Sequence, residues 1–208
     1  MSSKKFKDKD SRFKRAVNIF RKHDGMMRTS EALRAGVHPS TLYTMRDNET
    51  LIQVSRGLYR LSDLGSLDYP DLSTVSARIP GAVICLISAL AFHELTTQIP
   101  HKIHVALPRG AEEPRLKFPP LKTYRFTGKS FSEGVEKHKL DNVIVKVYDP
   151  EKTLADCFKF RNRLGLDTVI EALRFYRERK RVKVNNLMYY AEICRVKKII
   201  RPYLEAIL

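Results

Sequence analysis

Between Arg28 and Leu42 the chain carries the residue spacing of a helix-turn-helix. Counted from Arg28, Ala32 is the fifth residue, Gly36 the ninth, and Val37 and Leu42 the tenth and fifteenth. A small residue at the fifth position lets two helices cross closely, and the glycine supplies the positive φ of the tight turn. The two later apolar residues fill the angle between the helices. This spacing predicts a helix from about 30 to 35 and another from about 39 to 48.

Two short β-type runs follow this motif. Leu51–Val54 and Leu58–Leu61 stand on either side of Arg56-Gly57, which predicts a hairpin of the kind that forms the wing of a winged helix. Motif and wing together, on a basic chain, favour a winged helix that binds DNA. A winged helix used for protein contact and a plain αα-hairpin are the alternatives.

The charge of the chain points in the same direction. The net charge is +16, of which residues 1–70 carry +6 and residues 71–208 carry +10, so the excess is not confined to one tail. Hydrophobic residues make up 43% of the chain, enough to build a core. A field of this sign attracts nucleic acid and accelerates association with it. The alternative is a soluble surface with surplus lysine.

The cysteines and the apolar segments indicate a cytoplasmic protein. Cys85, Cys157 and Cys194 are odd in number, far apart and surrounded by apolar residues, which predicts buried free thiols in a reducing compartment rather than disulfides or zinc ligands. The longest apolar run, Ala82–Phe92, is shorter than the about 20 residues that cross a bilayer. The first ten residues are charged and resemble no signal peptide. We expect no association with a membrane.

The hydrophobic pattern predicts an α+β protein of two domains. We expect a flexible basic arm over 1–10, a winged helix-turn-helix DNA-binding domain over 11–62, and a connection over 63–79 that could hold a short helix near 69–78. An α+β domain with a helical C-terminal half should follow over 80–208. The remaining helices are expected near 11–23, 82–95, 151–163, 167–180, 185–195 and 197–207, and the remaining strands near 103–107, 123–127 and 143–148.

The candidate DNA contacts come from three places in the winged helix. The third helix should present polar side chains to base edges, the wing tip a cation to phosphate or the minor groove, and the start of the second helix a phosphate site. These candidates are Ser40, Thr41, Tyr43, Thr44 and Arg46 from the third helix, Arg56 from the wing, and Arg28 and Ser30 from the second helix. The alternative for each is an ordinary solvated residue.

Two helices of the C-terminal half carry cations at helical spacing. We expect Lys152, Lys159 and Arg163 on the outer face of one, and Arg174, Arg177 and Arg181 on the outer face of the next. Two adjacent basic faces would suit an acidic protein or RNA. A solvated face with weak local pairs such as Lys152–Asp156 is the equal alternative.

No pattern of residues favours catalysis. Asp149, Glu151 and Lys152 resemble a nuclease cluster only superficially, because no second acidic residue in a matched strand context accompanies them. His93 follows an apolar helix without a nucleophile motif, and His101 and His104 lack a third ligand at metal spacing. We expect no enzyme activity, no catalytic residues, no cofactor and no metal.

Three segments resemble the AbiEi family, whose members are antitoxins of AbiE-type (type IV) toxin–antitoxin systems and transcriptional regulators. The segments are Arg56–Leu61, Ile84–Thr96 and Glu151–Arg161. The resemblance implies a winged helix that binds inverted repeats in its own promoter and represses the operon. It also implies a C-terminal domain that counteracts a nucleotidyltransferase-like toxin. The alternative is a protein- or RNA-interaction module whose basic C-terminal helices bind a partner, with the winged helix used for assembly.

Overall fold

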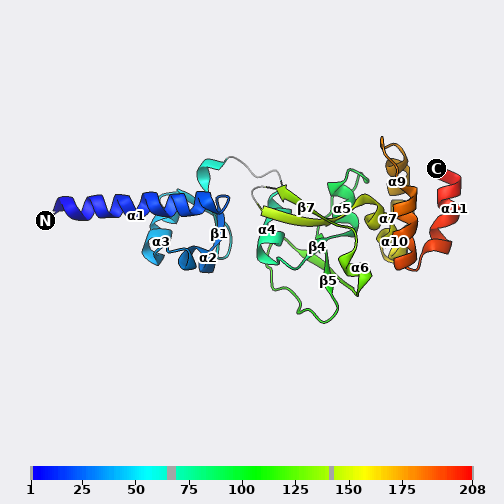
Figure 1. Cartoon of the computed structure of the whole chain (residues 1–208), viewed down its shortest axis with the longest axis horizontal. Helices are drawn as coiled ribbons and strands as arrows, with labels where there is room; N and C mark the ends of the chain where they lie inside the picture. Colours follow the sequence, from blue (N-terminus) through cyan, green and yellow to red (C-terminus); the bar gives the residue numbers. More distant parts are fainter. Residues whose placement is uncertain (1, 65–68, 141–142, 208) are drawn as a thin grey trace. The chain divides into compact units, whose positions relative to one another are not determined.

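The computed structural model describes residues 2–64, 69–140 and 143–207, and of residues 2–10 it describes the backbone alone. The chain divides into two compact units (Figure 1). The first comprises Met1–Arg78 with Lys139–Ile144, and the second comprises Ile79–His138 with Val145–Leu208. Each unit has a hydrophobic core of its own. The α+β class predicted from the sequence, with an N-terminal winged helix-turn-helix, is confirmed.

The first unit contains the winged helix and one further helix. Its elements are α1 (Ser2–Lys22), β1 (Met26–Arg28), α2 (Thr29–Arg34), α3 (Pro39–Asp47), β2 (Leu51–Ser55), β3 (Leu58–Leu61), the 3-10 turn η1 (Ser62–Leu64) and α4 (Pro70–Arg78).

The helix-turn-helix is built as its spacing predicts. Ala32 is fully buried, and its carbonyl accepts a hydrogen bond of 2.9 Å from the amide of Val37 across the turn. Gly36 has φ +93°, a conformation that residues with a Cβ rarely adopt. Val37 and Leu42 are buried in the core of this unit. The turn is therefore held by backbone bonding and by packing at once.

The wing is the outer hairpin of a three-stranded antiparallel sheet with the order β1-β3-β2. Arg56 and Gly57 form the tip between β2 and β3, and Gly57 has φ +70°. The strand β1 was not expected from the sequence. Its three residues are too few to show the alternation by which a strand is detected, and it exists because Met26–Arg28 pairs with β3.

Helix α1 begins at Ser2, nine residues before the predicted start at Ser11. Residues 2–10, expected as a flexible arm, therefore have helical backbone in the structure. The segment contains neither glycine nor proline, so no residue in it interrupts a helix that continues from residues 11–22. Ser11, the first residue of the predicted helix, therefore lies inside α1.

The predicted connection contains a helix with a buried face. The short helix expected near residues 69–78 is α4, in which Leu72 and Val75 are buried along with three small polar residues. It belongs to the same unit as the winged helix. Residues 65–68 lie outside the described part of the chain.

The second unit is a mixed five-stranded sheet, in the order β6-β5-β4-β8-β7, with helices gathered at one end (Figure 1). The strands of this sheet are β4 (Val83–Ile84), β5 (Ile103–Pro108), β6 (Leu121–Phe126), β7 (Val135–Leu140) and β8 (Val143–Tyr148), and the last residues of β7 and the first of β8 belong to the first unit. Its helices are α5 (Leu86–Phe92), α6 (Lys129–Ser132), α7 (Pro150–Lys159), α8 (Arg161–Leu164), α9 (Leu166–Arg177), α10 (Val184–Ile193) and α11 (Lys197–Ile207).

In this unit one predicted helix was wrong in part and one strand was not predicted. Residues 82–95 were expected as one helix, but Val83–Ile84 is a central strand and the helix begins only at Leu86. An unbroken apolar run has no periodicity that separates a buried strand from a buried helix. Strand β7 was missed because four of its six residues are charged or histidine, a composition typical of an edge strand.

The apolar surroundings of the three cysteines were interpreted correctly, since all three are buried and none forms a disulfide. Across the described ranges of the chain, no helix combines the length and apolarity that a membrane span requires.

Candidate nucleic-acid interface

Helix α3 presents a polar face from the centre of the winged helix. His38 caps the helix, its Nδ1 accepting from the amide of Ser40 at 3.3 Å, and Pro39 occupies the first helical position. Leu42 and Met45 anchor the inner face in the core. The predicted contact residues Ser40, Tyr43, Thr44 and Arg46 are exposed, and Thr41 is half-buried.

Hydrogen bonds within α3 limit what its hydroxyls can offer. The Thr44 hydroxyl donates to the Ser40 carbonyl at 2.8 Å, and the Ser40 hydroxyl lies 2.8 Å from Nδ1 of His38. A threonine bonded back to its own helix presents its methyl group and an acceptor oxygen rather than a donor. Tyr43 is 47% exposed and is the largest side chain on this face. The hydroxyls of Ser40 and Thr44 are therefore engaged within α3 and its cap.

Arg46, the cation of this helix with the chemistry of a guanine reader, is engaged by its neighbours. Its guanidinium forms an ion pair of 2.7 Å with Asp47 and lies 5.2 Å from the centre of the Tyr43 ring. A base contact by Arg46 would require that ion pair to open. An exposed pair of this kind contributes little stability, so opening it costs little.

The wing tip is held in place while its cation faces solvent. The Arg56 carbonyl accepts a 2.8 Å hydrogen bond from Nη1 of Arg78, and the Gly57 carbonyl accepts one of 2.9 Å from the amide of Thr29. The Arg56 side chain is exposed and forms no ion pair with the described residues. The tip thus combines a fixed backbone with an available guanidinium.

Arg28 was expected to contact a phosphate, but its side chain is bonded to the backbone of α4. Its guanidinium donates through Nε to the Ala77 carbonyl at 2.8 Å and also through Nη2, and the side chain is half-buried. Its amide donates to the Glu31 carboxylate at 2.8 Å. A carboxylate at the start of α2 repels phosphate. The bonds of the Arg28 guanidinium to Ala77 instead join the start of α2 to α4. Ser30 is exposed beside it, and a contact by Ser30 stays a prediction.

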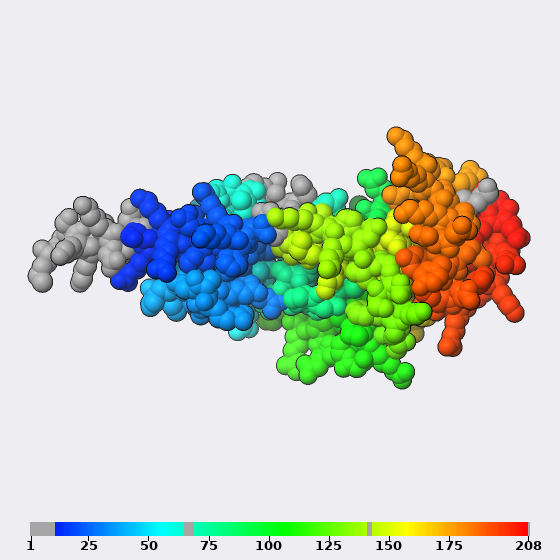
Figure 2. Space-filling view, in the orientation of Figure 1, coloured from blue at the N-terminus to red at the C-terminus, as the bar shows by residue number. Residues whose placement is uncertain are grey.

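Helix α1 contacts β1, α3 and β3, and Figure 2 shows its surface, in dark blue, beside the lighter blue surface of the helix-turn-helix. Phe13, Ala16, Val17 and Phe20 form the face of α1 that packs in the hydrophobic core of this unit. The cations Arg15 and Lys22 are exposed on the same helix and were not among the residues predicted to contact DNA. Their signal was available, because they are seven residues apart and so share a face.

In the second unit, Lys152 is not on an outer basic face, and that prediction was wrong. The side chain has 0% exposure, its Nζ lies 2.5 Å from the Asp156 carboxylate, and it lies 4.1 Å from the centre of the Tyr148 ring. Every residue of α7 from Glu151 to Phe158 is buried, so this helix has no solvent face over that span. Burial on all sides cannot be deduced from helical spacing.

Lys159 and Arg163 remain exposed and flank one aromatic ring. Lys159 Nζ lies 5.8 Å and the Arg163 guanidinium 6.0 Å from the centre of the Phe160 ring. They do not belong to one continuous helix, because α7 ends at Lys159 and α8 begins at Arg161. The two cations are brought together by this corner rather than by helical periodicity.

The other predicted cations of this unit lie among acidic residues or backbone carbonyls. Arg174 shares a hollow of about 390 Å³ with Asp167 and Glu171. Arg177 donates to the Ile207 carbonyl at 3.0 Å. Arg181 lies beyond the end of α9, in a hollow of about 820 Å³ that is lined by three glutamates and also by Arg179, Lys180 and Lys183. These arginines form a surface of mixed sign rather than two adjacent basic faces.

The residues weighed for catalysis have structural partners. Glu151 is buried and accepts a 2.7 Å hydrogen bond from the Tyr176 hydroxyl, and Nε2 of His93 lies 2.7 Å from the Tyr148 carbonyl. Asp149 caps α7 by accepting from the amide of Lys152, and burial raises the pKa of this carboxyl. In the described part of the chain, no three histidine, cysteine or acidic side chains form a group that could hold a metal ion.

The first unit belongs to the helix-turn-helix class of folds, and its α3 and its wing cation Arg56 are exposed. Residues 14–62 match the model of the family described as "Transcriptional regulator, AbiEi antitoxin". The resemblance to that family inferred from the sequence is thus confirmed over the winged helix.

The fold of most of the chain has a counterpart among solved structures. It is similar to the crystal structure of the RV2827C protein from Mycobacterium tuberculosis, with a TM-score of 0.51 and 14% sequence identity. The similarity covers 91% of this chain and 79% of that one. At this identity it shows a shared fold. A comparison with curated protein sequences gave no match.

Proposed function

We propose that this protein is a DNA-binding repressor of its own operon and the antitoxin of a nucleotidyltransferase-like toxin. In this proposal residues 11–62 are the DNA-binding domain, 63–79 connect it, and residues 80–208 form the antitoxin domain of a cytoplasmic protein. The observation that carries the first role is the exposed polar face of α3 beside a wing whose Arg56 has no ion-pair partner among the described residues. The match of residues 14–62 to a family of regulators and antitoxins supports both roles.

The operator should contain two half-sites in inverted orientation, occupied by two copies of the protein. One winged helix buries too little surface for tight and specific binding at physiological salt. The limited donor capacity of α3 strengthens this expectation, because Thr44 and Arg46 are both bonded within their own helix. Two weakly specific modules on one operator reach a specificity that a single module does not.

A gel-shift titration on the DNA upstream of the gene tests the first role. We expect a discrete complex at nanomolar protein that resists unlabelled nonspecific competitor, with protection of two inverted half-sites in footprinting. A smeared shift that competitor removes would contradict the repressor role and favour the interaction-module alternative.

Substitution of Arg56 by Ala should weaken binding to all DNA sequences alike. A phosphate contact carries no sequence information, so the slope of log K against log salt concentration should fall by about one. The measurement is a fluorescence-anisotropy titration at several salt concentrations, on operator and scrambled DNA. Arg201→Ala, on the exposed face of α11 in the second unit, is the matched control. A loss confined to the operator would instead make Arg56 a base-reading residue.

The second role is tested at the Phe160 corner, where the structure brings two exposed cations together. In cells that co-express the adjacent toxin, Lys159→Glu/Arg163→Glu should abolish growth rescue while DNA affinity stays within about threefold, since an antitoxin contact there would lose both positive charges. Lys198→Glu/Arg201→Glu on α11 makes the same change in net charge elsewhere. Full rescue by the Phe160-corner variant would show that this corner is only a solvated surface.

A further inference from the structure

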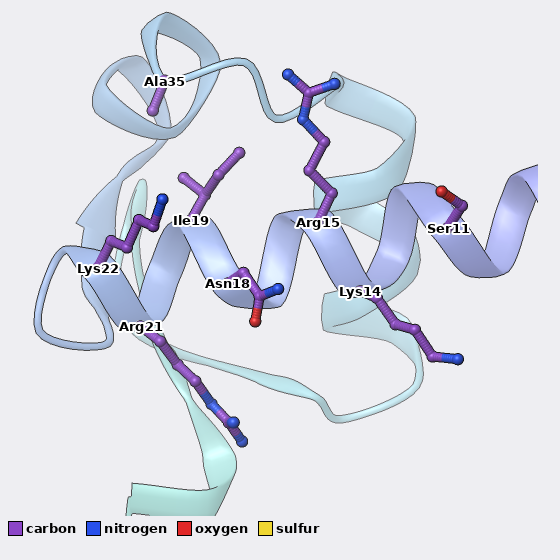
Figure 3. A pocket seen from close by; sticks show the side chains of 8 residues that line it. All are labelled: Ser11, Lys14, Arg15, Asn18, Ile19, Arg21, Lys22 and Ala35. Atoms are coloured by element: carbon purple, nitrogen blue, oxygen red, sulfur yellow. The ribbon is translucent and has the colours of Figure 1, made fainter.

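The winged-helix unit has a basic hollow along α1 that belongs to none of the predicted DNA contacts. The hollow measures about 1080 Å³ and is lined by Lys14, Arg15, Asn18 and Lys22, with Ile19 and Ala35 as its apolar part. In Figure 3, Ala35 faces Ile19 from the end of α2, and the Arg15 side chain points toward the segment that leads into α3. The hollow is therefore bounded by the helix-turn-helix itself.

The charge of this hollow has one sign. None of the side chains that line it is acidic. Arg21, at its edge, is paired with Asp63 at 2.9 Å, whereas Arg15 and Lys22 are exposed and form no ion pair with any described residue. Two exposed cations without an ion-pair partner among the described residues, in a hollow whose lining has no acidic side chain, are the composition of a polyanion-binding surface.

The spacing of Arg15 and Lys22 along α1 suits a partner whose negative charges repeat at short intervals. Ser11, Arg15, Asn18 and Lys22 recur at the interval that places residues on one face of a helix, so that the amide of Asn18 stands between the two cations and the hydroxyl of Ser11 precedes them. At about 1.5 Å of rise per residue, Arg15 and Lys22 start about 10 Å apart. DNA carries one negative charge for about every 1.7 Å of its axis, so the face spans more than one phosphate.

We infer that this α1 hollow binds the phosphate backbone of DNA, as a second, sequence-independent contact surface of the winged helix. The inference rests on the proposed DNA-binding function and extends its footprint beyond α3 and the wing. Only Ile19 and Ala35 of the lining residues are apolar, while the cations and the amide of Asn18 match phosphate oxygens. In this arrangement α3 reads the operator, and α1 adds affinity for any duplex.

The test is a double substitution, Arg15→Ala/Lys22→Ala, in the full chain. Loss of two phosphate contacts should lower the salt slope of binding by about two and the affinity by roughly 10- to 50-fold at 0.1 M salt. The ratio of operator to scrambled-DNA affinity should not change. The control Lys198→Ala/Arg201→Ala removes the same charge from α11 and should leave the slope unchanged. Far-UV circular dichroism and thermal unfolding of each variant verify that the fold is retained.

The results distinguish a failure of this inference from a failure of the proposed DNA-binding function on which it rests. If the wild-type protein binds no DNA, the proposed function fails and the inference fails with it. If the wild type binds, and Arg56→Ala lowers the slope but the α1 variant does not, the inference alone is overturned. A change in the operator-to-scrambled ratio would also overturn it, because that would make α1 a base-reading element.

Discussion

Lys152→Met is expected to lower the free energy of unfolding by about 3–5 kcal/mol, the usual cost of leaving a buried charge without its partner. Lys152 and Asp156 are both fully buried and lie 2.5 Å apart. The variant removes the cation but keeps the carboxylate, for which Cys194 provides a hydrogen bond of 3.1 Å from Sγ. Urea unfolding monitored by circular dichroism measures the loss.

The pH dependence of that loss identifies its cause. Burial raises the pKa of Asp156, and removing Lys152 raises it further, so the folded variant should hold a proton that the unfolded chain releases. Its stability should therefore fall as the pH rises above the ordinary range of aspartate, and the penalty should be larger at pH 8 than at pH 5. The double variant Lys152→Met/Asp156→Leu removes both charges and should be close to wild type. A single variant that loses less than about 1 kcal/mol would contradict the importance of this pair.

Between pH 6.5 and about pH 4, the protonation of His104 is expected to remove about 3 kcal/mol of stability. Burial, assisted by the positive charge of Lys122, lowers the pKa of His104 from 6.5 to about 4. Because the folded protein resists the proton that the unfolded chain accepts, this stability is complete above pH 6.5 and is lost as the pH falls toward 4. His104 is 8% exposed, and its Nδ1 has no hydrogen-bond partner among the described residues, so no carboxylate compensates the charge.

His104→Gln provides the comparison, since it removes the titrating ring and keeps the backbone amide that donates to Ser88 Oγ at 2.9 Å. The difference in unfolding free energy between the two proteins, measured by urea titration at pH 7, 6, 5 and 4, should shrink with acidity. A constant difference over this range would show that His104 does not titrate there.

The winged helix shows how far local pattern can predict a structure. Ala32, Gly36 and Leu42 each perform in the structure the task that their position predicts, because a tight turn and a close helix crossing depend on residues within about fifteen positions of each other. The wing followed from two short runs around Arg56-Gly57 for the same reason. The prediction of which face of α3 points outward was likewise correct, since Leu42 and Met45 are its buried residues.

The environment of individual side chains could not be predicted from the sequence in the same way. Spacing alone placed Lys152 outside, whereas the packing of α5, α9, α10 and α11 around α7 places it inside. Arg28 was expected at a phosphate, but its guanidinium is engaged by Ala77, a residue 49 positions away. Strand β4 was assigned to a helix because its pairing partners, β5 and β8, are distant in sequence.

By itself, the sequence determined the class of the protein, the helix-turn-helix and its wing, and the face that α3 presents, because each of these depends on short-range periodicity and on the backbone preferences of individual residues. Only the tertiary structure decided which cations are free to meet a polyanion. It buries Lys152, engages Arg28 and Arg46, and leaves Arg15, Lys22 and Arg56 exposed. The availability of a charge depends on the groups that other segments bring within a few ångströms of it, and those distances exist only once the chain has folded.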